Sequence, residues 1–123
     1  MPNEFLLLKD LIAYQKAVEA GKISWKIFLK MDWHEKKILG DQFICAVDSV
    51  GANIAEGYGR FRYMDRIKFY YNARGSLMEA KHWSLLLCNR KLINKEEFNL
   101  LQDIFNELGK QLNIFINKCK PKK

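Results

Sequence analysis

Proline is missing from the whole interior of this sequence. The two prolines are Pro2 and Pro121, so the 118 residues between them contain none. Because proline breaks helices and glycine clusters mark turns, an interior without proline and with few glycine clusters favours long helices over strands. A chain of 123 residues can bury one core without disulfides or metals, and we expect a single domain over residues 1–123.

Four stretches of this interior have apolar residues at the three- and four-residue steps of an amphipathic helix. They cover approximately residues 11–30, 34–56, 63–89 and 95–118. Four amphipathic helices with short connections bury their apolar faces against one another. The predicted fold is therefore all-α, an antiparallel up-down-up-down four-helix bundle.

Each expected helix should turn one apolar face towards the interior. For residues 11–30 this face consists of Leu11, Tyr14, Val18, Trp25 and Phe28. For residues 34–56 it consists of Leu39, Phe43, Val47, Val50 and Ile54. For residues 63–89 it consists of Phe69, Ala73, Leu77, Ala80, Ser84 and Leu87, with Gly75 as a further small residue that lets a neighbouring helix approach. For residues 95–118 it consists of Phe98, Leu101, Phe105, Leu108, Leu112, Phe115 and, just beyond, Cys119.

The sequence contains more large apolar residues than one bundle interior can hold. The surplus consists of Trp25, Trp33, Ile44, Phe61, Tyr70, Tyr71 and Trp83. Several of these should form an exposed apolar patch, and such patches usually mark oligomer interfaces. The sequence thus predicts that the bundle associates with copies of itself.

Helix ends are marked by capping residues and by glycine. Asp32 with Glu35, and Asn94 with Glu97, have the three-residue spacing of an N-terminal capping box. Gly57 is expected to be the left-handed residue just past the end of the second helix. These signals separate the helices from one another.

Cysteine and histidine usage indicates neither a metal site nor a disulfide framework. Cys45, Cys88 and Cys119 are odd in number and contain no CxxC pair, and His34 and His82 have no ligand at metal-binding spacing. We expect reduced, buried thiols in a cytoplasmic protein, without metal or cofactor. No signal peptide is visible, and no apolar run reaches the roughly 20 residues of a membrane span.

The positive charge lies in the second half of the sequence. Residues 1–56 hold seven Lys/Arg against eight Asp/Glu, whereas residues 57–123 hold fourteen against six. The candidate nucleic-acid-binding residues are Arg60, Arg62, Arg66, Lys68 and Arg74, which alternate with aromatic residues. Arg and Lys hold phosphates, and aromatic rings stack unpaired bases. The alternative is a solvated helix face whose aromatic residues are buried in the bundle or in an oligomer.

The last lysines of the sequence allow two interpretations. They are Lys118, Lys120, Lys122 and Lys123. We expect a solubilising tail, with a contribution to a phosphate-binding surface as the alternative.

Three segments resemble one known family. Asp48 to Arg60, DSVGANIAEGYGR, resembles the signature of the 23S rRNA-intervening sequence protein family of bacteria, and Lys9–Ala17 and Ala73–Ala80 resemble its first and third helices. The resemblance implies a four-helix bundle of unknown function that assembles as a homopentamer and has no enzyme activity. Related bundle proteins are accessory factors of retroelement reverse transcriptases, where they bind nucleic acid and the polymerase.

Four residues of the signature are candidates for a structural motif: Asn53, Glu56, Gly57 and Gly59. Glu56 should pair with a cation of the next helix, for example Arg74, and Asn53 should hydrogen-bond across the bundle, because a buried polar group must be paired. A ligand site is the alternative role of this motif.

No catalytic arrangement stands out in the sequence, and we expect no enzyme. The leading hypothesis is a self-assembling basic protein that binds RNA or DNA through phosphate contacts with low sequence specificity. The alternative is a protein–protein scaffold or accessory subunit, for example of a reverse transcriptase. No membrane partner is expected.

Overall fold

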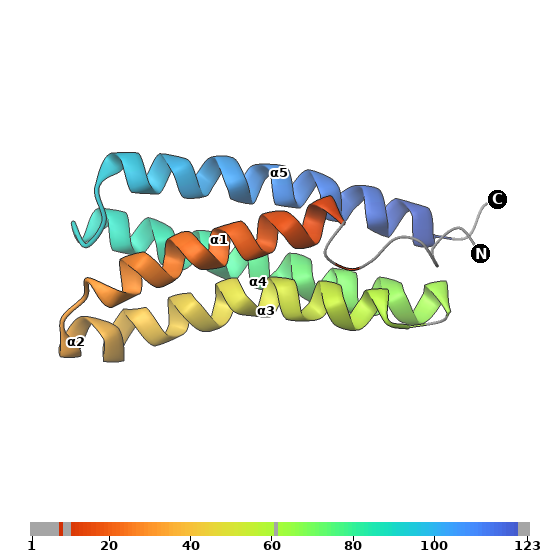
Figure 1. Cartoon of the computed structure of the whole chain (residues 1–123), viewed down its shortest axis with the longest axis horizontal. Helices are drawn as coiled ribbons and strands as arrows, with labels where there is room; N and C mark the ends of the chain where they lie inside the picture. Colours follow the sequence, from red (N-terminus) through yellow and green to blue (C-terminus); the bar gives the residue numbers. More distant parts are fainter. Residues whose placement is uncertain (1–7, 9–10, 61, 121–123) are drawn as a thin grey trace.

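The described part of the chain is helical and contains no strand. The computed structural model describes residues 8, 11–60 and 62–120. The elements are α1 (Ile12–Leu29), α2 (Trp33–Glu35), η3 (Lys36–Gly40), α3 (Asp41–Tyr58), α4 (Tyr63–Asn89) and α5 (Lys95–Cys119). Figure 1 shows that the four long helices run alternately in opposite directions along one axis. The predicted four-helix bundle is thereby confirmed.

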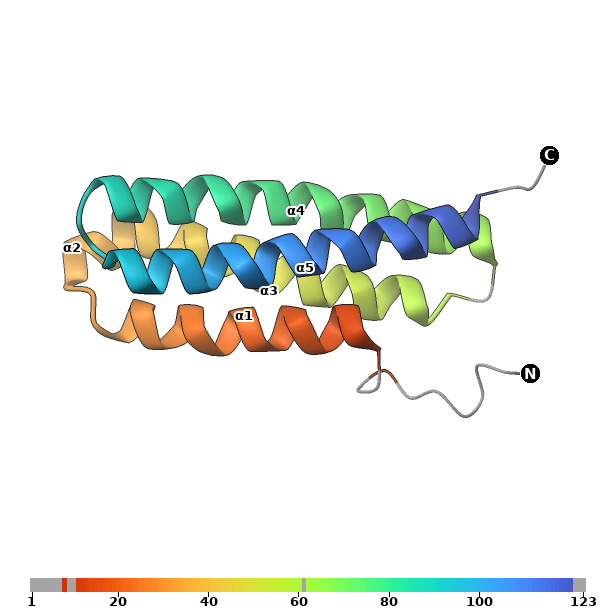
Figure 2. The same ribbon diagram turned by 90° about the horizontal axis from the view of Figure 1, so that it is seen from above.

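The order of the helices around the bundle decides which faces can meet. α1 packs against α3 and α5, and α4 packs against the same two helices. α1 and α4 therefore lie at opposite corners, as the view from above shows (Figure 2). Consequently, the outer faces of these two helices point away from each other.

Most of the buried core of the bundle consists of aliphatic side chains, and Phe43 and Phe105 are its largest fully buried residues. η3 and α3 together bury every residue of the face expected for residues 34–56, including Leu39, Phe43 and Ile54, and α5 buries Phe105 and Leu108. Side chains of this size each contribute about 1.5–3 kcal/mol when removed from water. This burial holds the long helices together.

The interior face of α1 differs from the expected one. The buried residues of this helix are Ala13, Ala17, Ala20, Ser24 and Ile27. Val18 and Trp25, which were expected inside, are exposed. The prediction followed the large apolar residues, whereas the small ones face inward because they let α3 and α5 approach closely.

α4 is apolar on more than one side. Tyr70 is buried, although it was expected among the surplus, and Phe69 is only partly buried. Burial raises the pKa of Tyr70 to about 12. Gly75, which was expected to face a neighbouring helix, lies on the exposed side, where a Cβ atom would meet nothing within 4 Å.

Both predicted capping boxes are confirmed. The Asp32 carboxylate accepts a hydrogen bond of 2.8 Å from Glu35 N, and Asp32 N donates one of 2.8 Å to Glu35 Oε1. Asn94 and Glu97 form the same reciprocal pair, at 2.8 and 3.0 Å. The second helix is not regular after its cap, because η3 is a π-helical turn that ends at Gly40.

The expectation of buried thiols is only partly correct. Cys119 is buried and Cys88 is partly buried, but Cys45 is exposed on α3. Among residues 8, 11–60 and 62–120, no helix combines the length and apolar content that a membrane span requires.

Candidate nucleic-acid interface

The connection between α3 and α4 carries the signature and most of the predicted basic residues. Gly57 lies inside α3 and has no positive φ. The prediction that Gly57 adopts a left-handed conformation just past the helix end is therefore wrong. A Cβ atom at this position would lie 2.7 Å from Tyr70 Cε1 and 3.1 Å from Phe69 Cβ. Glycine is therefore needed because the aromatic residues of α4 pack directly on the α3 backbone. Gly59 ends the helix with an ordinary φ of −73°.

Arg60 contacts both helices that the α3–α4 connection joins. Its Nη2 donates to Glu56 Oε2 at 2.8 Å, and its guanidinium lies 4.8 Å from the centre of the Phe69 ring. The expected pair between Glu56 and Arg74 is therefore wrong. A partner four residues away on the same turn is within easier reach than one on another helix.

Arg66, on α4, contacts the end of α3 from the other side of the connection. Its Nε donates to the backbone carbonyl of Arg60 at 2.6 Å, and its guanidinium lies 5.8 Å from the centre of the Tyr58 ring. A cation at the C-terminal end of a helix is favoured by the helix dipole. Arg66 thus stabilises the end of α3 and is only partly exposed.

The end of α5 lies beside the first turns of α4. Cys119 and Ile116 pack in one cluster with Tyr70. Burial raises the pKa of the Cys119 thiol, and the nearby Arg66 charge lowers it to a smaller extent. The last described lysines of the chain, Lys118 and Lys120, consequently join the basic residues of the α3–α4 connection.

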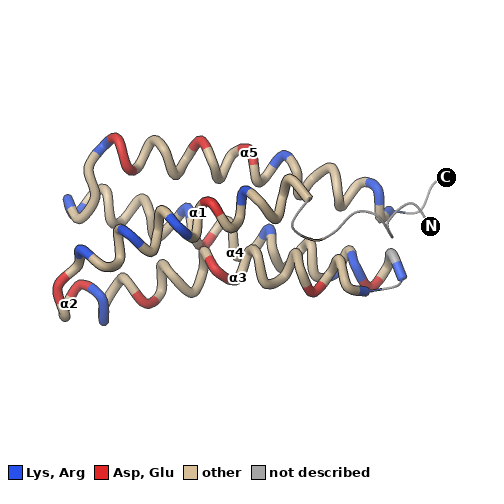
Figure 3. The backbone as a smooth tube through the Cα atoms, in the orientation of Figure 1, with Lys and Arg blue, Asp and Glu red and all other residues tan. Residues whose placement is uncertain are grey.

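This part of the molecule is named the basic end. Its cations are Arg60, Arg62, Arg66, Lys68, Lys118 and Lys120. The acids among the described residues of this end are Glu56 and Asp65, so six cations face two acids. Figure 3 shows the blue segments of α4 and α5 gathered there. Four of the five predicted nucleic-acid-binding residues are brought together at the basic end.

Arg74 does not belong to that group. It lies eight residues beyond Arg66, which is about 12 Å along a helix axis. Its Nη1 donates to Asn113 Oδ1 at 2.9 Å, and its guanidinium lies 5.0 Å from the centre of the Tyr71 ring. Arg74 therefore ties the middle of α4 to α5.

Asn53 also differs from its expected role. Its Nδ2 donates to the carbonyl of Ser49 at 2.9 Å, within the same helix. The amide therefore does not bridge the bundle. Of the four structural-motif residues, Gly57 and Glu56 make the contacts that hold the α3–α4 connection in place.

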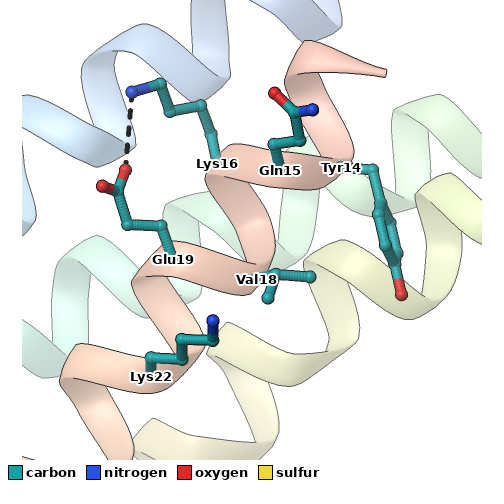
Figure 4. A pocket seen from close by; sticks show the side chains of 6 residues that line it. All are labelled: Tyr14, Gln15, Lys16, Val18, Glu19 and Lys22. Atoms are coloured by element: carbon teal, nitrogen blue, oxygen red, sulfur yellow. Dashed lines mark hydrogen bonds and ion pairs between the residues drawn. The ribbon is translucent and has the colours of Figure 1, made fainter. Parts of the chain in front are cut away.

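Two depressions lie on the surface of α1. One, of about 600 Å³, is lined by Tyr14, Gln15, Lys16, Val18, Glu19 and Lys22 (Figure 4). Within it, Lys16 Nζ and Glu19 Oε1 form an ion pair at 3.4 Å. The other lies between α1 and α3. In the described part of the chain, no group of three or more His, Cys, Asp or Glu is placed to hold a metal.

Comparison with known proteins identifies the family. The model of the 23S rRNA-intervening sequence protein family matches residues 9–114. A crystal structure of a protein of unknown function, from the S23 ribosomal protein family of Bacteroides thetaiotaomicron VPI-5482, superposes with a TM-score of 0.78 at 22% identity, over 85% of this chain and 98% of that one. At this identity the likeness shows the fold alone, and a search of curated proteins found no match. Because the family model spans most of the sequence, the chain belongs to the 23S rRNA-intervening sequence protein family.

Proposed function

We propose that the protein is a non-catalytic, self-assembling protein that binds RNA or DNA through phosphate contacts at its basic end. The observation that carries the proposal is that two distant segments of the sequence bring six cations to one end of the bundle, where the described residues include only two acids. Such a local excess of positive charge attracts phosphate backbones and releases their counterions.

The cations of the basic end divide into two groups. Arg60 and Arg66 are engaged within the fold, with Glu56, a backbone carbonyl and aromatic rings. The side chains of the remaining four are exposed and make no hydrogen bond or ion pair with another described residue: Arg62, Lys68, Lys118 and Lys120. The second group is therefore available for phosphates, while the first group holds the surface in shape.

The start of α4 supports the same interpretation. Arg62 is its N-cap residue, and the Arg62 side chain makes no cap hydrogen bond. The first N–H groups of a helix are positive and bind anions well. Contacts of this kind position a backbone without reading bases, so we expect low sequence specificity.

Self-assembly would strengthen this binding. The homopentamer that the family resemblance implies would carry five copies of the basic end. Several weak contacts on one assembly act together through their effective concentration. A protein with modest affinity per copy can in this way bind a long nucleic acid firmly.

The test is fluorescence anisotropy of labelled single-stranded and duplex RNA and DNA. The variant combines Arg62→Gln, Lys68→Gln and Lys118→Gln, and the matched control combines Lys26→Gln, Arg90→Gln and Lys110→Gln, which removes the same charge elsewhere. We expect the variant to reduce the slope of log K against log salt by roughly 2 to 3, because each phosphate that a cation neutralises contributes about 0.7–0.9 to that slope. Equal effects of both triple variants, or no binding by the unaltered protein at low salt, would contradict the proposal.

A second candidate function is a protein–protein scaffold or accessory subunit, for example of a reverse transcriptase. The observation that favours it is the exposed apolar side of α4, which carries Met64, Met78 and Leu85. An excess of RNA should displace such a partner only if both use the basic end. Displacement of a bound partner protein by RNA would therefore assign the partner to the basic end, and its retention would assign it to another surface.

A further inference from the structure

A group of large apolar side chains is exposed where α1, α2 and η3 follow one another. The exposed fractions are 67% for Trp33, 63% for Ile38, 56% for Leu29 and 50% for Trp25. All four lie within residues 25–38, and Figure 1 shows the connection between α1 and α2 at one extremity of the bundle. This group is named the tryptophan patch. Large apolar residues that are exposed together, rather than singly, mark an interaction surface.

The fold holds the tryptophan patch in shape from beneath. The Phe28 ring stacks on the Trp25 ring, with 5.2 Å between their centres. Phe28 in turn packs directly on η3, where a Cβ atom at Gly40 would lie 2.9 Å from Phe28 Cδ1. The same π-helical turn buries Leu39, which is 4% exposed, and directs the preceding Ile38 towards solvent. The exposed side chains are therefore in place before any partner binds.

Lysines lie directly beside the tryptophan patch. Residues 25–38 contain four lysines and two acids, and both acids accept backbone N–H groups in the capping box of α2. Lys37 Nζ lies 5.0 Å from the centre of the Trp33 ring, and Lys36 Nζ lies 5.2 Å from the centre of the Phe28 ring. The side chains of Lys36 and Lys37 make no hydrogen bond or ion pair with another described residue. The complementary partner of this surface is therefore both apolar and negatively charged.

The chemistry and the shape of the tryptophan patch fit the surface of a membrane. Tryptophan rings favour the headgroup region of a bilayer, and lysines are attracted to anionic lipids. A helix or strand of a partner protein docks into a groove or along a sheet edge. The tryptophan patch instead protrudes at the end of the bundle, and neither of the two depressions on α1 includes a residue of it. A fluid bilayer accommodates protruding apolar side chains without a groove.

We propose that the tryptophan patch binds peripherally to the surface of membranes that contain anionic lipids. Trp33 and Ile38, its two most exposed side chains, enter the boundary between headgroups and acyl chains, while Lys36 and Lys37 lie among the lipid phosphates. The expectation that no membrane partner exists rests on the lack of a long apolar run, which peripheral binding does not require. The basic end lies at the other extremity of the bundle (Figure 3), so this inference does not depend on nucleic-acid binding.

The test is sedimentation of the protein with vesicles, made either of phosphatidylglycerol and phosphatidylcholine in equal amounts or of phosphatidylcholine alone. The variant combines Trp33→Gln and Ile38→Gln. The matched control combines Ile12→Gln and Ile114→Gln, which removes two exposed apolar side chains far from the patch. Far-ultraviolet circular dichroism confirms that each protein is folded, and size exclusion confirms that all have the same assembly state.

We expect the unaltered protein and the control to bind the anionic vesicles, and to bind phosphatidylcholine alone more weakly. The variant should bind the anionic vesicles about tenfold more weakly or less, because each large apolar side chain removed from water contributes roughly a factor of ten. Lipids brominated in their acyl chains should quench the tryptophan fluorescence of the unaltered protein. No binding to anionic vesicles, or equal binding by the variant and the control, would overturn the proposal.

A basic protein can also bind anionic vesicles through charge alone, and the basic end provides the control for this. The triple variant Arg62→Gln, Lys68→Gln and Lys118→Gln should still bind the vesicles, because its tryptophan patch is intact. Loss of vesicle binding in this triple variant would assign the binding to the basic end and overturn the proposal. A Trp33→Gln and Ile38→Gln variant that loses binding of labelled RNA but not of vesicles would assign the patch to nucleic acid instead.

A second variant covers the case in which the first does not fold. It combines Lys36→Gln and Lys37→Gln, and its matched control combines Lys22→Gln and Lys110→Gln, which removes the same charge elsewhere. We expect the lysine variant to bind anionic vesicles roughly tenfold more weakly than this control, because each lysine near the lipid headgroups strengthens binding severalfold. Equal binding by the two would overturn the proposal.

Discussion

The two ends of the bundle are both basic, but they use their charges differently. The end opposite the basic end is named the capped end, where α1 meets α2 and α4 meets α5. Its cations are Lys26, Lys30, Lys36, Lys37, Arg90, Lys91 and Lys95, and its acids are Asp32, Glu35, Glu96 and Glu97. Figure 3 shows red and blue segments mixed there. Both ends thus carry net positive charge, although four of the seven cations of the capped end come from the first half of the sequence.

Three of the four acids of the capped end make hydrogen bonds within the fold. Asp32 and Glu35 close one capping box, and Glu97 closes the other while it accepts a hydrogen bond of 2.8 Å from Lys30 Nζ. At the basic end, no side chain caps the start of α4. Carboxylates at two helix starts thus offset part of the positive charge of the capped end. At the basic end, the start of α4 and the exposed cations remain open to an anion.

The largest effect is expected at Gly57. Gly57→Ala should lower the free energy of unfolding by about 1–3 kcal/mol, because the new methyl group would overlap the Tyr70 ring. Gly59→Ala is the control, since its Cβ would lie 3.5 Å from the nearest atom, an ordinary distance for packed atoms. Chemical denaturation measures both. Equal stabilities of the two variants would show that α3 and α4 are not tightly packed at Gly57.

The difference in capping predicts a difference in the cost of removing the cap residue. Asn94→Ala should lower the free energy of unfolding by about 1 kcal/mol, since it leaves a first-turn N–H group without its acceptor. Arg62→Ala, at the matching position of α4, should change it by less than about 0.5 kcal/mol, because the Arg62 side chain forms no cap hydrogen bond. Urea denaturation of both variants checks the comparison. A larger destabilisation by Arg62→Ala would reverse it.

The smallest effect concerns the pH dependence of the capped end. Burial alone would raise the pKa of Glu97, but the hydrogen bonds from Lys30 Nζ and Asn94 N and the Lys30 charge outweigh it and hold the pKa below its usual value. A lowered folded-state pKa means that the ionised carboxylate stabilises the fold above the ordinary Glu pKa. This contribution is lost as the pH falls through the folded-state pKa.

Glu97→Gln should remove this contribution and keep the capping box, because glutamine can also accept from Asn94 N. We expect a loss of at most about 1 kcal/mol at neutral pH, since exposed ion pairs contribute little, and a smaller difference from the unaltered protein in acid. Glu96→Gln is the control, and thermal unfolding between acidic and neutral pH is the measurement. A difference that grows on acidification would contradict the assigned direction of the pKa.

The candidate site was predictable only in part. The sequence places Arg60, Arg62, Arg66 and Lys68 within nine residues, so their proximity is local. The lysines of α5 are distant in sequence, and the signal that could have located them is the antiparallel direction of the last two helices. The engagement of Arg66 by the Arg60 carbonyl was not predictable, because it depends on how the chain turns between α3 and α4.

The sequence by itself determined the number, length and main caps of the helices. Helix propensity and the two capping boxes depend on residues that are close in sequence, so local interactions are sufficient to specify them. Tertiary packing decided which faces are buried. α1 turns its alanines inward and leaves Trp25 exposed, and Gly57 is required by the neighbouring ring of Tyr70. These outcomes depend on the distance between helix axes, which small residues shorten and which no single helix specifies.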